Sequence, residues 1–466
     1  MSPCDPANSS VKTEQPTFWP SKRSGPHAGS TLYTSIQAMD EAGIPYCVLH
    51  QYETFPEEIP SDVDCVVPRE FISTILPQAL AQHGLHIVQD VHHGHEPDGH
   101  LYVLVHDLCC MDTALKLDVI SHWAYNGRLF YSADQLLKSR RKYKRFWVLT
   151  PKLEFICYLL KKVTRASLDA GQQRYLTELY RRDPSGCRQE VERWWGRDSA
   201  RCLVNAAETG EWSLVKRRLS SVRSELLRLG VLRDPIGVFS FRLGEIKRWL
   251  LRWFYPAGLV VAILGPDGVG KSTVVREVRA TSEPAFFFTR VVHFPPRLAR
   301  LFQGERVSEP HRLAAWPLPI SAFKIMYWVV SITLDYFLHL RPQMVRATLV
   351  LYDSYLLDIL VDPLRYRYGG PLWLARLVWR LSPQPETVVI LLDAPIETIG
   401  MRKRELPFEE MARQRKAYRA LMKDLANAVV VDASRPTKTV AADVTRAILA
   451  HLAARTAKRL NLELRR

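Results

Sequence analysis

The sequence lacks the close cysteine pairs of a zinc site or a disulfide scaffold. Eight cysteines stand in 466 residues, and no two form a Cys-x-x-Cys pair. Neither a structural zinc site nor a disulfide framework is therefore expected. All eight cysteines precede residue 203. A reducing, cytoplasmic compartment is the expected location.

The sequence also lacks an uninterrupted membrane span, and we do not expect a signal peptide. Residues 1–29 are rich in Ser and Pro without an apolar core, and we expect them to be mobile. The longest apolar stretch, Trp316–Leu340, is interrupted by Lys324, Asp335 and His339. A charge at the centre of a bilayer is costly. We expect a buried or amphipathic helix there, with a membrane-associated helix as the alternative.

Basic residues are scarce in the front of the chain and outnumber acidic residues in the rest. Residues 1–135 carry 6 Lys/Arg and 17 Asp/Glu, whereas residues 136–466 carry 58 and 31. The basic part suits a polyanion such as a nucleotide, a nucleic acid or an anionic membrane. Nucleic acid and peripheral membrane contact are both compatible with this charge, and neither is required by it.

The length predicts two or three domains, and the residue patterns divide the chain accordingly. Residues 30–150 alternate helical and strand-like segments, as in a small α+β domain. Residues 151–255 show helical spacing and predict a helical connector. Residues 256–455 alternate apolar strands with helices, which predicts an α/β domain with a parallel sheet covered by helices on both faces. Residues 456–466 form a basic tail.

A glycine-rich loop is the most specific motif. Residues 265–273, GPDGVGKST, match GxxxxGK[ST] between the strand LVVAIL and a helix. The glycines let backbone N–H groups surround phosphate oxygens, and the helix N-terminus adds partial positive charge. Lys271 can reach the β- and γ-phosphates of ATP, and the Ser272 hydroxyl can ligate Mg²⁺. The expected nucleotide-binding residues are Gly265, Asp267, Gly268, Gly270, Lys271, Ser272 and Thr273. This loop predicts a P-loop NTPase-type fold.

A carboxylate follows the second buried strand of this domain. Asp353 ends the run VLYD, where it can hold Mg²⁺ or orient an acceptor. A strand-end aspartate that caps the next turn is the alternative.

Residues 256–455 resemble the thymidylate kinase-like group through GPDGVGKST, YDSYLLD and RKREL…RQRKAY. The resemblance implies that Asp267 contacts an acceptor hydroxyl. It also implies an arginine-bearing lid that neutralises the transferring phosphoryl group. The lid candidates are Arg402, Arg404, Arg413 and Arg415, with a plain basic helix as the alternative.

One position departs from that group. Ser354 stands where its Asp-Arg motif has an arginine that grips the acceptor phosphate. Arg365 and Arg367 are candidates to supply this charge, while Asp358 and Asp362, which precede them, are expected to be structural.

Three aspartates in the front domain form a second candidate site. Asp62 and Asp64 lie one residue apart on a predicted strand and so share a face, and Asp118 would join them if its strand lay alongside. The segment resembles the nucleotidyltransferase superfamily, which implies a catalytic metal cluster. The superfamily's Gly-Ser turn is replaced by Leu49-His50-Gln51-Tyr52. An active transferase, a degenerate or regulatory module, and an unrelated aspartate pair all remain open.

The histidines of VHHGHEPDGH (His92, His93, His95 and His100) match no zinc spacing, and we expect a surface loop.

The sequence therefore predicts an ATP- and Mg²⁺-dependent kinase acting on a nucleoside monophosphate or a sugar-type acceptor. The alternatives are a metal-dependent nucleotidyltransferase with an accessory P-loop domain, and an ATP-binding switch or assembly protein with little turnover.

Overall fold

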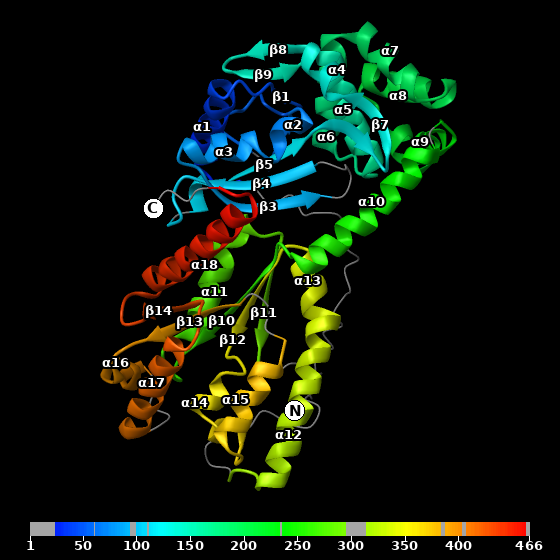
Figure 1. The fold of residues 1–466 in the computed structure, drawn as a ribbon. Coiled ribbons are helices and arrows are strands. Elements are labelled where there is room, and N and C mark those ends of the chain that lie inside the picture. The colour runs from blue at the N-terminus through cyan, green and yellow to red at the C-terminus, as the bar shows by residue number, and fades with distance from the viewer. Residues whose placement is uncertain are drawn as a thin grey trace, which may run out of the picture.

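The computed structural model describes residues 24–59, 61–93, 99–109, 111–233, 235–294, 314–383, 387–402 and 407–462. Figure 1 shows two sheets, one above the other, with a group of helices beside the upper sheet and α10 running down from it. Most of the expected mobile N-terminus, His95 and Arg404 lie outside the described residues.

A seven-stranded mixed sheet organises the N-terminal region. Its strand order is β3-β4-β5-β2-β1-β9-β8. The strands are β1 (Cys47–Val48), β2 (Val63–Val66), β3 (His86–His93), β4 (Gly99–Val105), β5 (Leu115–Ile120), β8 (Arg140–Tyr143) and β9 (Phe146–Leu149). Helices α1 (Ala28–Glu41), α2 (Arg69–Ile72) and α3 (Ile75–Gln82) accompany this sheet. Helix α1 ends shortly before Gly43, whose φ of 65° suits a residue that terminates a helix.

Successive side chains of β2 point alternately into the hydrophobic core and toward the opposite face of the sheet. Val63 and Cys65 join the core on the side of α1 and α3, so Asp64 between them faces the other way. Strands β2 and β5 pair in parallel with Asp64 opposite Asp118. The strand neighbourhood expected for these two aspartates is therefore confirmed.

Helices cover the other face of this sheet. They are α5 (Pro151–Thr164), α6 (Ala170–Arg182), α7 (Pro184–Trp194), α8 (Arg197–Thr209) and α9 (Ser213–Arg233), followed by α10 (Pro235–Phe254). A separate hairpin of β6 (His122–Tyr125) and β7 (Arg128–Ser132), with α4 (Ala133–Lys138), precedes them. Their shared core includes Phe155, Leu179 and Trp212, together with Leu49 and Val66 from the sheet. The helical character predicted for this part of the chain is confirmed.

The C-terminal region contains a five-stranded parallel sheet. Its order is β11-β12-β10-β13-β14, with every pair parallel. The strands are β10 (Leu259–Leu264), β11 (Phe288–His293), β12 (Thr348–Asp353), β13 (Thr387–Asp393) and β14 (Ala428–Asp432). The mixed α/β class with a parallel sheet is confirmed. Strand β11 was not anticipated, because its side chains are half exposed and do not form an apolar run.

Helices cover both faces of this sheet. Val261 and Ile263 of β10 share a core with α11 (Lys271–Thr281) and α18 (Thr437–Arg459), while Val260 and Ala262 share one with the opposite face. The remaining helices are α12 (Leu318–Asp335), α13 (Arg341–Val345), α14 (Asp358–Val361), α15 (Leu372–Leu381), α16 (Ile396–Arg402) and α17 (Phe408–Lys423). Helix α18 also reaches the N-terminal sheet, where the Thr456 hydroxyl donates to the Val88 carbonyl at 3.1 Å.

The long apolar stretch forms α12, a π-helical turn at Tyr336–Leu340 and α13. Among the described residues, this is the one helical segment long and apolar enough to cross a membrane, and only 22% of its most apolar window is buried. Of the two forms expected here, a buried or an amphipathic helix, the structure shows the amphipathic one. One side packs against the protein, and the other carries exposed Phe323, Met326 and Val330.

Candidate functional site

The glycine-rich loop follows the central strand β10. Gly265, Gly268 and Gly270 all have positive φ, at 147°, 85° and 103°, a region that favours glycine. A Cβ on Gly265 would lie 2.7 Å from the Leu392 carbonyl oxygen, so that position also lacks space for a side chain. Helix α11 begins directly afterwards at Lys271. Its first N–H groups, which have no partner within a helix, point back toward the loop.

Lys271 is folded over this loop. Its buried ammonium donates to the carbonyl oxygens of Gly265 at 2.7 Å and Pro266 at 3.1 Å, and lies 3.3 Å from Asp267 Oδ1. The loop thus holds a fixed positive charge at its centre.

A hydroxyl and a carboxylate meet beside the loop. Ser272 Oγ donates to Asp353 Oδ2 at 2.7 Å. Asp353 lies opposite Ile263 in the neighbouring strand, so β10 and β12 end at the same edge of the sheet. The next residue, Ser354, has φ of 74°, a costly conformation for a residue other than glycine. His293 ends β11 with Nδ1 3.5 Å from Asp353 Oδ2. Thr273 is exposed in the first turn of α11.

Asp267 in the loop forms an ion pair with a single guanidinium nitrogen of Arg365. Arg365 Nη1 lies 2.7 and 2.9 Å from the two carboxylate oxygens. Burial raises the pKa of Asp267, but the charges of Lys271 and Arg365 outweigh it and lower the pKa to about 2. Arg367 points elsewhere, donating to the Ala314 carbonyl at 3.1 Å. Arg365 and Arg367 were the two candidates for the positive charge that the arginine of the Asp-Arg motif would supply. The structure brings Arg365 to the loop and places Arg367 against the Ala314 carbonyl.

Asp358 and Asp362 hold the neighbouring chain in place. Asp358 accepts from the Tyr418 hydroxyl at 2.8 Å, and burial raises its pKa. Asp362 accepts from the Arg365 backbone N–H at 3.2 Å and from the Gln414 side chain at 3.1 Å. Both contacts fix the segment that carries Arg365.

The three described lid candidates have different partners. Arg402 donates to the carbonyl oxygens of Val269, within the glycine-rich loop, and Ala433. Arg415 pairs with Asp393 at the end of β13, at 2.7 and 3.0 Å. Arg413 pairs with Glu410 and the Val361 carbonyl. The structure therefore brings Arg402 to the loop, whereas Arg413 and Arg415 pair with Glu410 and Asp393.

The carboxylates of the N-terminal region are gathered as their spacing predicts. Asp62, Asp64 and Asp118 each offer an oxygen within 4.8 Å of the others. Such a set of hard oxygen donors fits a divalent cation.

A buried ammonium lies against these carboxylates. Lys161 Nζ of α5 is 2.7 and 2.6 Å from the two oxygens of Asp64, and the side chains of Lys161 and Asp64 are 8% and 7% exposed. Lys161 also donates to His50 Nε2 at 3.1 Å. Burial, then the charges of Lys161 and Lys162, depress the pKa of His50 well below its usual value. His50 is therefore a neutral acceptor, and its 3.2 Å approach to Asp64 is not an ion pair.

Sequence reasoning missed Lys161, His50 and Lys162. Burial and the charges of Lys161 and Arg165 lower the pKa of Lys162 to about 8. The available signal was the pair Lys161-Lys162 inside helix segment 153–163, where Glu154 is the one other charged residue. A lysine at a core-facing helical position needs a buried anion.

The histidine expectation was wrong for the residues that the structure describes. His92 and His93 end β3, and His100 lies on β4, so they belong to a hairpin rather than a loop. His100 is buried and its Nδ1 lies 2.9 Å from Asp90 Oδ1. Asp90, His92 and His100 lie close enough together to bind a metal ion. In this structure Asp90 already forms a hydrogen bond with His100.

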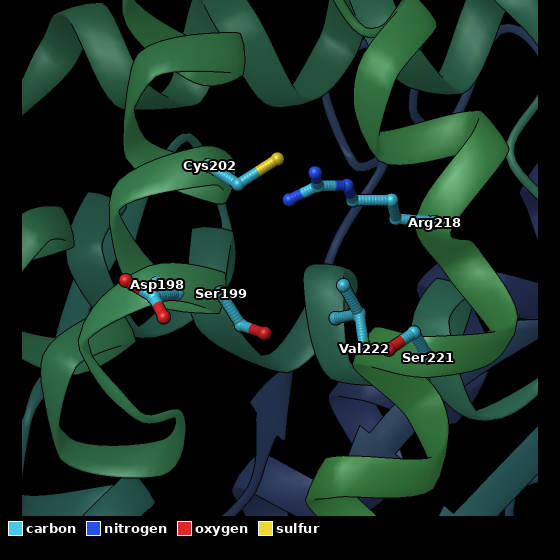
Figure 2. Close-up of a pocket in the computed structure, with 6 residues that line it drawn as sticks. All are labelled: Asp198, Ser199, Cys202, Arg218, Ser221 and Val222. Atoms are coloured by element: carbon cyan, nitrogen blue, oxygen red, sulfur yellow. The ribbon is translucent and has the colours of Figure 1, made fainter.

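A pocket between α8 and α9 lies apart from both candidate sites. Figure 2 shows Arg218 extending toward Cys202 across it. Its lining residues are Asp198, Ser199, Cys202, Arg218, Ser221 and Val222. None of the site residues predicted from the sequence lines this pocket.

Comparison with known proteins adds no family. No protein-family model matches the chain, and no curated protein is significantly similar to it.

Proposed function

We propose that this chain is an ATP- and Mg²⁺-dependent phosphotransferase that resembles thymidylate kinase. It would transfer the γ-phosphoryl group to a nucleoside monophosphate or a sugar-type acceptor. The contact between Ser272 Oγ and Asp353 Oδ2, at 2.7 Å beside the glycine-rich loop, carries this proposal.

Both Mg²⁺ and ATP fit the residues that are present. A hydroxyl and a carboxylate oxygen are hard donors of the kind Mg²⁺ prefers, so Ser272 and Asp353 would hold the ion. Bound Mg²⁺ supplies charge neutralisation on the phosphate oxygens. The positive-φ glycines and the start of α11 suit the phosphate chain.

Lys271 would move from its own loop carbonyls to the phosphates. Its three current partners, Gly265, Pro266 and Asp267, lie within the loop itself. The ammonium of Lys271 would therefore move only a short distance to reach phosphates bound in the loop. The ammonium would then stabilise charge that builds on the transferring group. Arg402 donates to the Val269 carbonyl and would hold the backbone of the loop in position through this hydrogen bond.

The acceptor would bind beside Asp267 and Arg365. Arg365 is the described arginine that lies against the loop from the acceptor side, and its fork geometry suits a phosphate. Asp267, ionised at neutral pH because its pKa is about 2, would orient Arg365 and accept from an acceptor hydroxyl.

An ADP-release assay with Mg²⁺, ATP and a panel of nucleoside monophosphates and sugars tests this function. Release that depends on one acceptor supports it and names the substrate. Tight ATP binding without release for any acceptor contradicts it and favours the switch or assembly protein. We place this reaction in the cytoplasm, in keeping with the free cysteines among the described residues.

A nucleotidyltransferase is the second candidate, favoured by the cluster of Asp62, Asp64 and Asp118. It would use metal held by the carboxylates. The 2.6 Å pair between Lys161 and Asp64 opposes it, because the ammonium already neutralises one of these ligands. Pyrophosphate release from ATP that is abolished in Asp62→Ala would support this candidate.

A further inference from the structure

Helix α10 carries an apolar stripe that no other described part of the protein covers. The stripe repeats every three or four residues, so it follows one side of the helix. Ile236 is 80% exposed and Phe239 is 65% exposed. The stripe consists of Ile236, Phe239, Leu243, Ile246, Leu250 and Phe254.

Helix α12 carries a second stripe with the same spacing. Phe323 is 73% exposed. The stripe consists of Ile320, Phe323, Met326, Val330 and Leu334, and continues to Phe337 in the π-helical turn. Helix α15 packs beside α12 through Ile325, Trp328, Ala375 and Val378, and exposes Leu372, Trp373, Leu377 and Leu381.

The helices meet along one edge of the molecule. Figure 1 shows α10 leading to α13 and on to α12 along one side. Arg341 of α13 bonds to the carbonyl oxygens of Trp253 and Phe254, at the end of α10. We call the exposed apolar residues named above on α10, α12 and α15 the docking face. Its exposed aromatic and aliphatic side chains exceed the scattered surface residues of an ordinary monomer.

Basic residues accompany this apolar surface. Helix α10 exposes two basic residues, Arg242 and Lys247. Its Arg248 pairs with Glu245, the one acidic residue of this helix, and its Arg252 is half-buried. Helix α15 contains Arg376 and Arg380, both exposed, and no acidic residue. Apolar stripes flanked by Lys and Arg are typical of helices that lie in the interface of an anionic bilayer. Long basic side chains can extend to the headgroups while the apolar stripe is buried.

Helix α12 would lie on a bilayer rather than cross it. Its Lys324 ammonium donates to the Tyr366 carbonyl at 2.7 Å. Ile325 and Trp328 on the same side are buried against α15. One side of α12 is therefore packed against the rest of the protein. A helix that spanned a bilayer would have to break these contacts.

We propose that the docking face binds the surface of a bilayer that contains anionic phospholipid. A second copy of this chain is the other apolar occupant. Its docking face would bring the same excess of basic residues to the contact, and like charges would oppose pairing. Anionic headgroups complement that charge.

Flotation with vesicles tests this proposal. Wild type is expected to float with vesicles of phosphatidylcholine and phosphatidylglycerol at low salt, and to dissociate at high salt. Ile246→Asp with Phe323→Asp, and separately Arg376→Glu with Arg380→Glu, are expected to lower the partition coefficient by about tenfold or more. Leu129→Asp, at an apolar residue 53% exposed on β7, is the matched control and should float like wild type.

Three results would overturn the proposal. One is wild-type flotation that both paired variants retain. Another is equal binding to vesicles of phosphatidylcholine alone. The third is an absence of flotation together with a dimer in sedimentation that Ile246→Asp with Phe323→Asp dissociates, which would assign the face to a second copy. Circular dichroism of each variant confirms that loss of binding is not loss of folding.

Discussion

Ser272 and Asp353 are 81 residues apart in the chain, yet the serine hydroxyl donates to the aspartate carboxylate at 2.7 Å. Two features of the parallel sheet produce this contact. First, strands β10 and β12 are direct neighbours with Ile263 opposite Asp353. Second, the glycine-rich loop follows β10 and folds back so that Ser272 lies beside the end of β12. The contact joins a loop suited to phosphate with a carboxylate suited to Mg²⁺.

Removing this carboxylate should weaken Mg²⁺ binding. Asp353→Asn keeps the size of the side chain but removes its charge. We expect the Mg²⁺ concentration for half-maximal ADP release to rise by about 10- to 100-fold, measured by Mg²⁺ titration at saturating ATP. Asp432→Asn is the control, since Asp432 ends β14 and bonds to Ser434. An unchanged Mg²⁺ requirement in Asp353→Asn would contradict this role.

Removing the Arg365 guanidinium should weaken acceptor binding. Arg365→Ala deletes the ion pair with Asp267 and the cation nearest the proposed acceptor. We expect the KM for the acceptor to rise by about tenfold or more, with little change in the KM for ATP, because a charge-assisted hydrogen bond is lost.

Arg367→Ala is the matched control two residues away. Its guanidinium faces the Ala314 carbonyl and the Trp316 ring, so its acceptor KM should stay near the wild-type value. Equal effects of the two substitutions in steady-state kinetics would remove Arg365 from the acceptor site.

Lys161 should stabilise the N-terminal region. Lys161→Met leaves three neighbouring carboxylates without the buried ammonium that pairs with Asp64. We expect a loss of about 3 kcal/mol in the free energy of unfolding, measured with urea, and partial recovery on addition of Mn²⁺. Lys162→Met, whose ammonium lies 4.6 Å from the Tyr158 ring centre, should cost about 1 kcal/mol or less. Equal losses in the two variants would contradict a specific role for the Lys161–Asp64 pair.

Glu154 should make stability depend on pH. Its carboxylate accepts hydrogen bonds from Tyr52 and Tyr175, but burial dominates and raises its pKa from 4.5 to about 7. The folded protein therefore holds a proton that the unfolded chain releases between these pH values. Stability from this group is complete below pH 4.5 and falls as the pH rises to about 7, by about 3 kcal/mol in total.

Urea unfolding of wild type and Glu154→Gln at several pH values between 4 and 8 measures this effect. The glutamine variant should lose the downward trend across that window. A difference between the two proteins that stays constant with pH would show that folding does not raise the pKa of Glu154.

The sequence predicted those features that depend on local pattern. Buried parallel strands such as Leu259–Leu264 and Thr387–Asp393 are continuous apolar runs, and the glycine-rich loop is a compact motif. The Asp64–Asp118 neighbourhood followed from strand alternation and one assumption about pairing, which the register confirms.

Features that depend on distant contacts escaped prediction. Lys161 meets Asp64 across 97 residues, and no local pattern encodes that distance. The choice between Arg365 and Arg367 also depended on tertiary structure. Arg367 has φ of 50° at the end of a short helical turn, which directs the two guanidinium groups to different partners.

We expect phosphoryl transfer to occur at the glycine-rich loop and not at the N-terminal carboxylates. The most direct measurement follows ADP and pyrophosphate together in one ATP reaction, with wild type, Lys271→Ala and Asp64→Asn. We predict acceptor-dependent ADP release that falls by about 100-fold or more in Lys271→Ala and persists in Asp64→Asn. Pyrophosphate release that vanishes in Asp64→Asn and survives in Lys271→Ala would contradict this expectation.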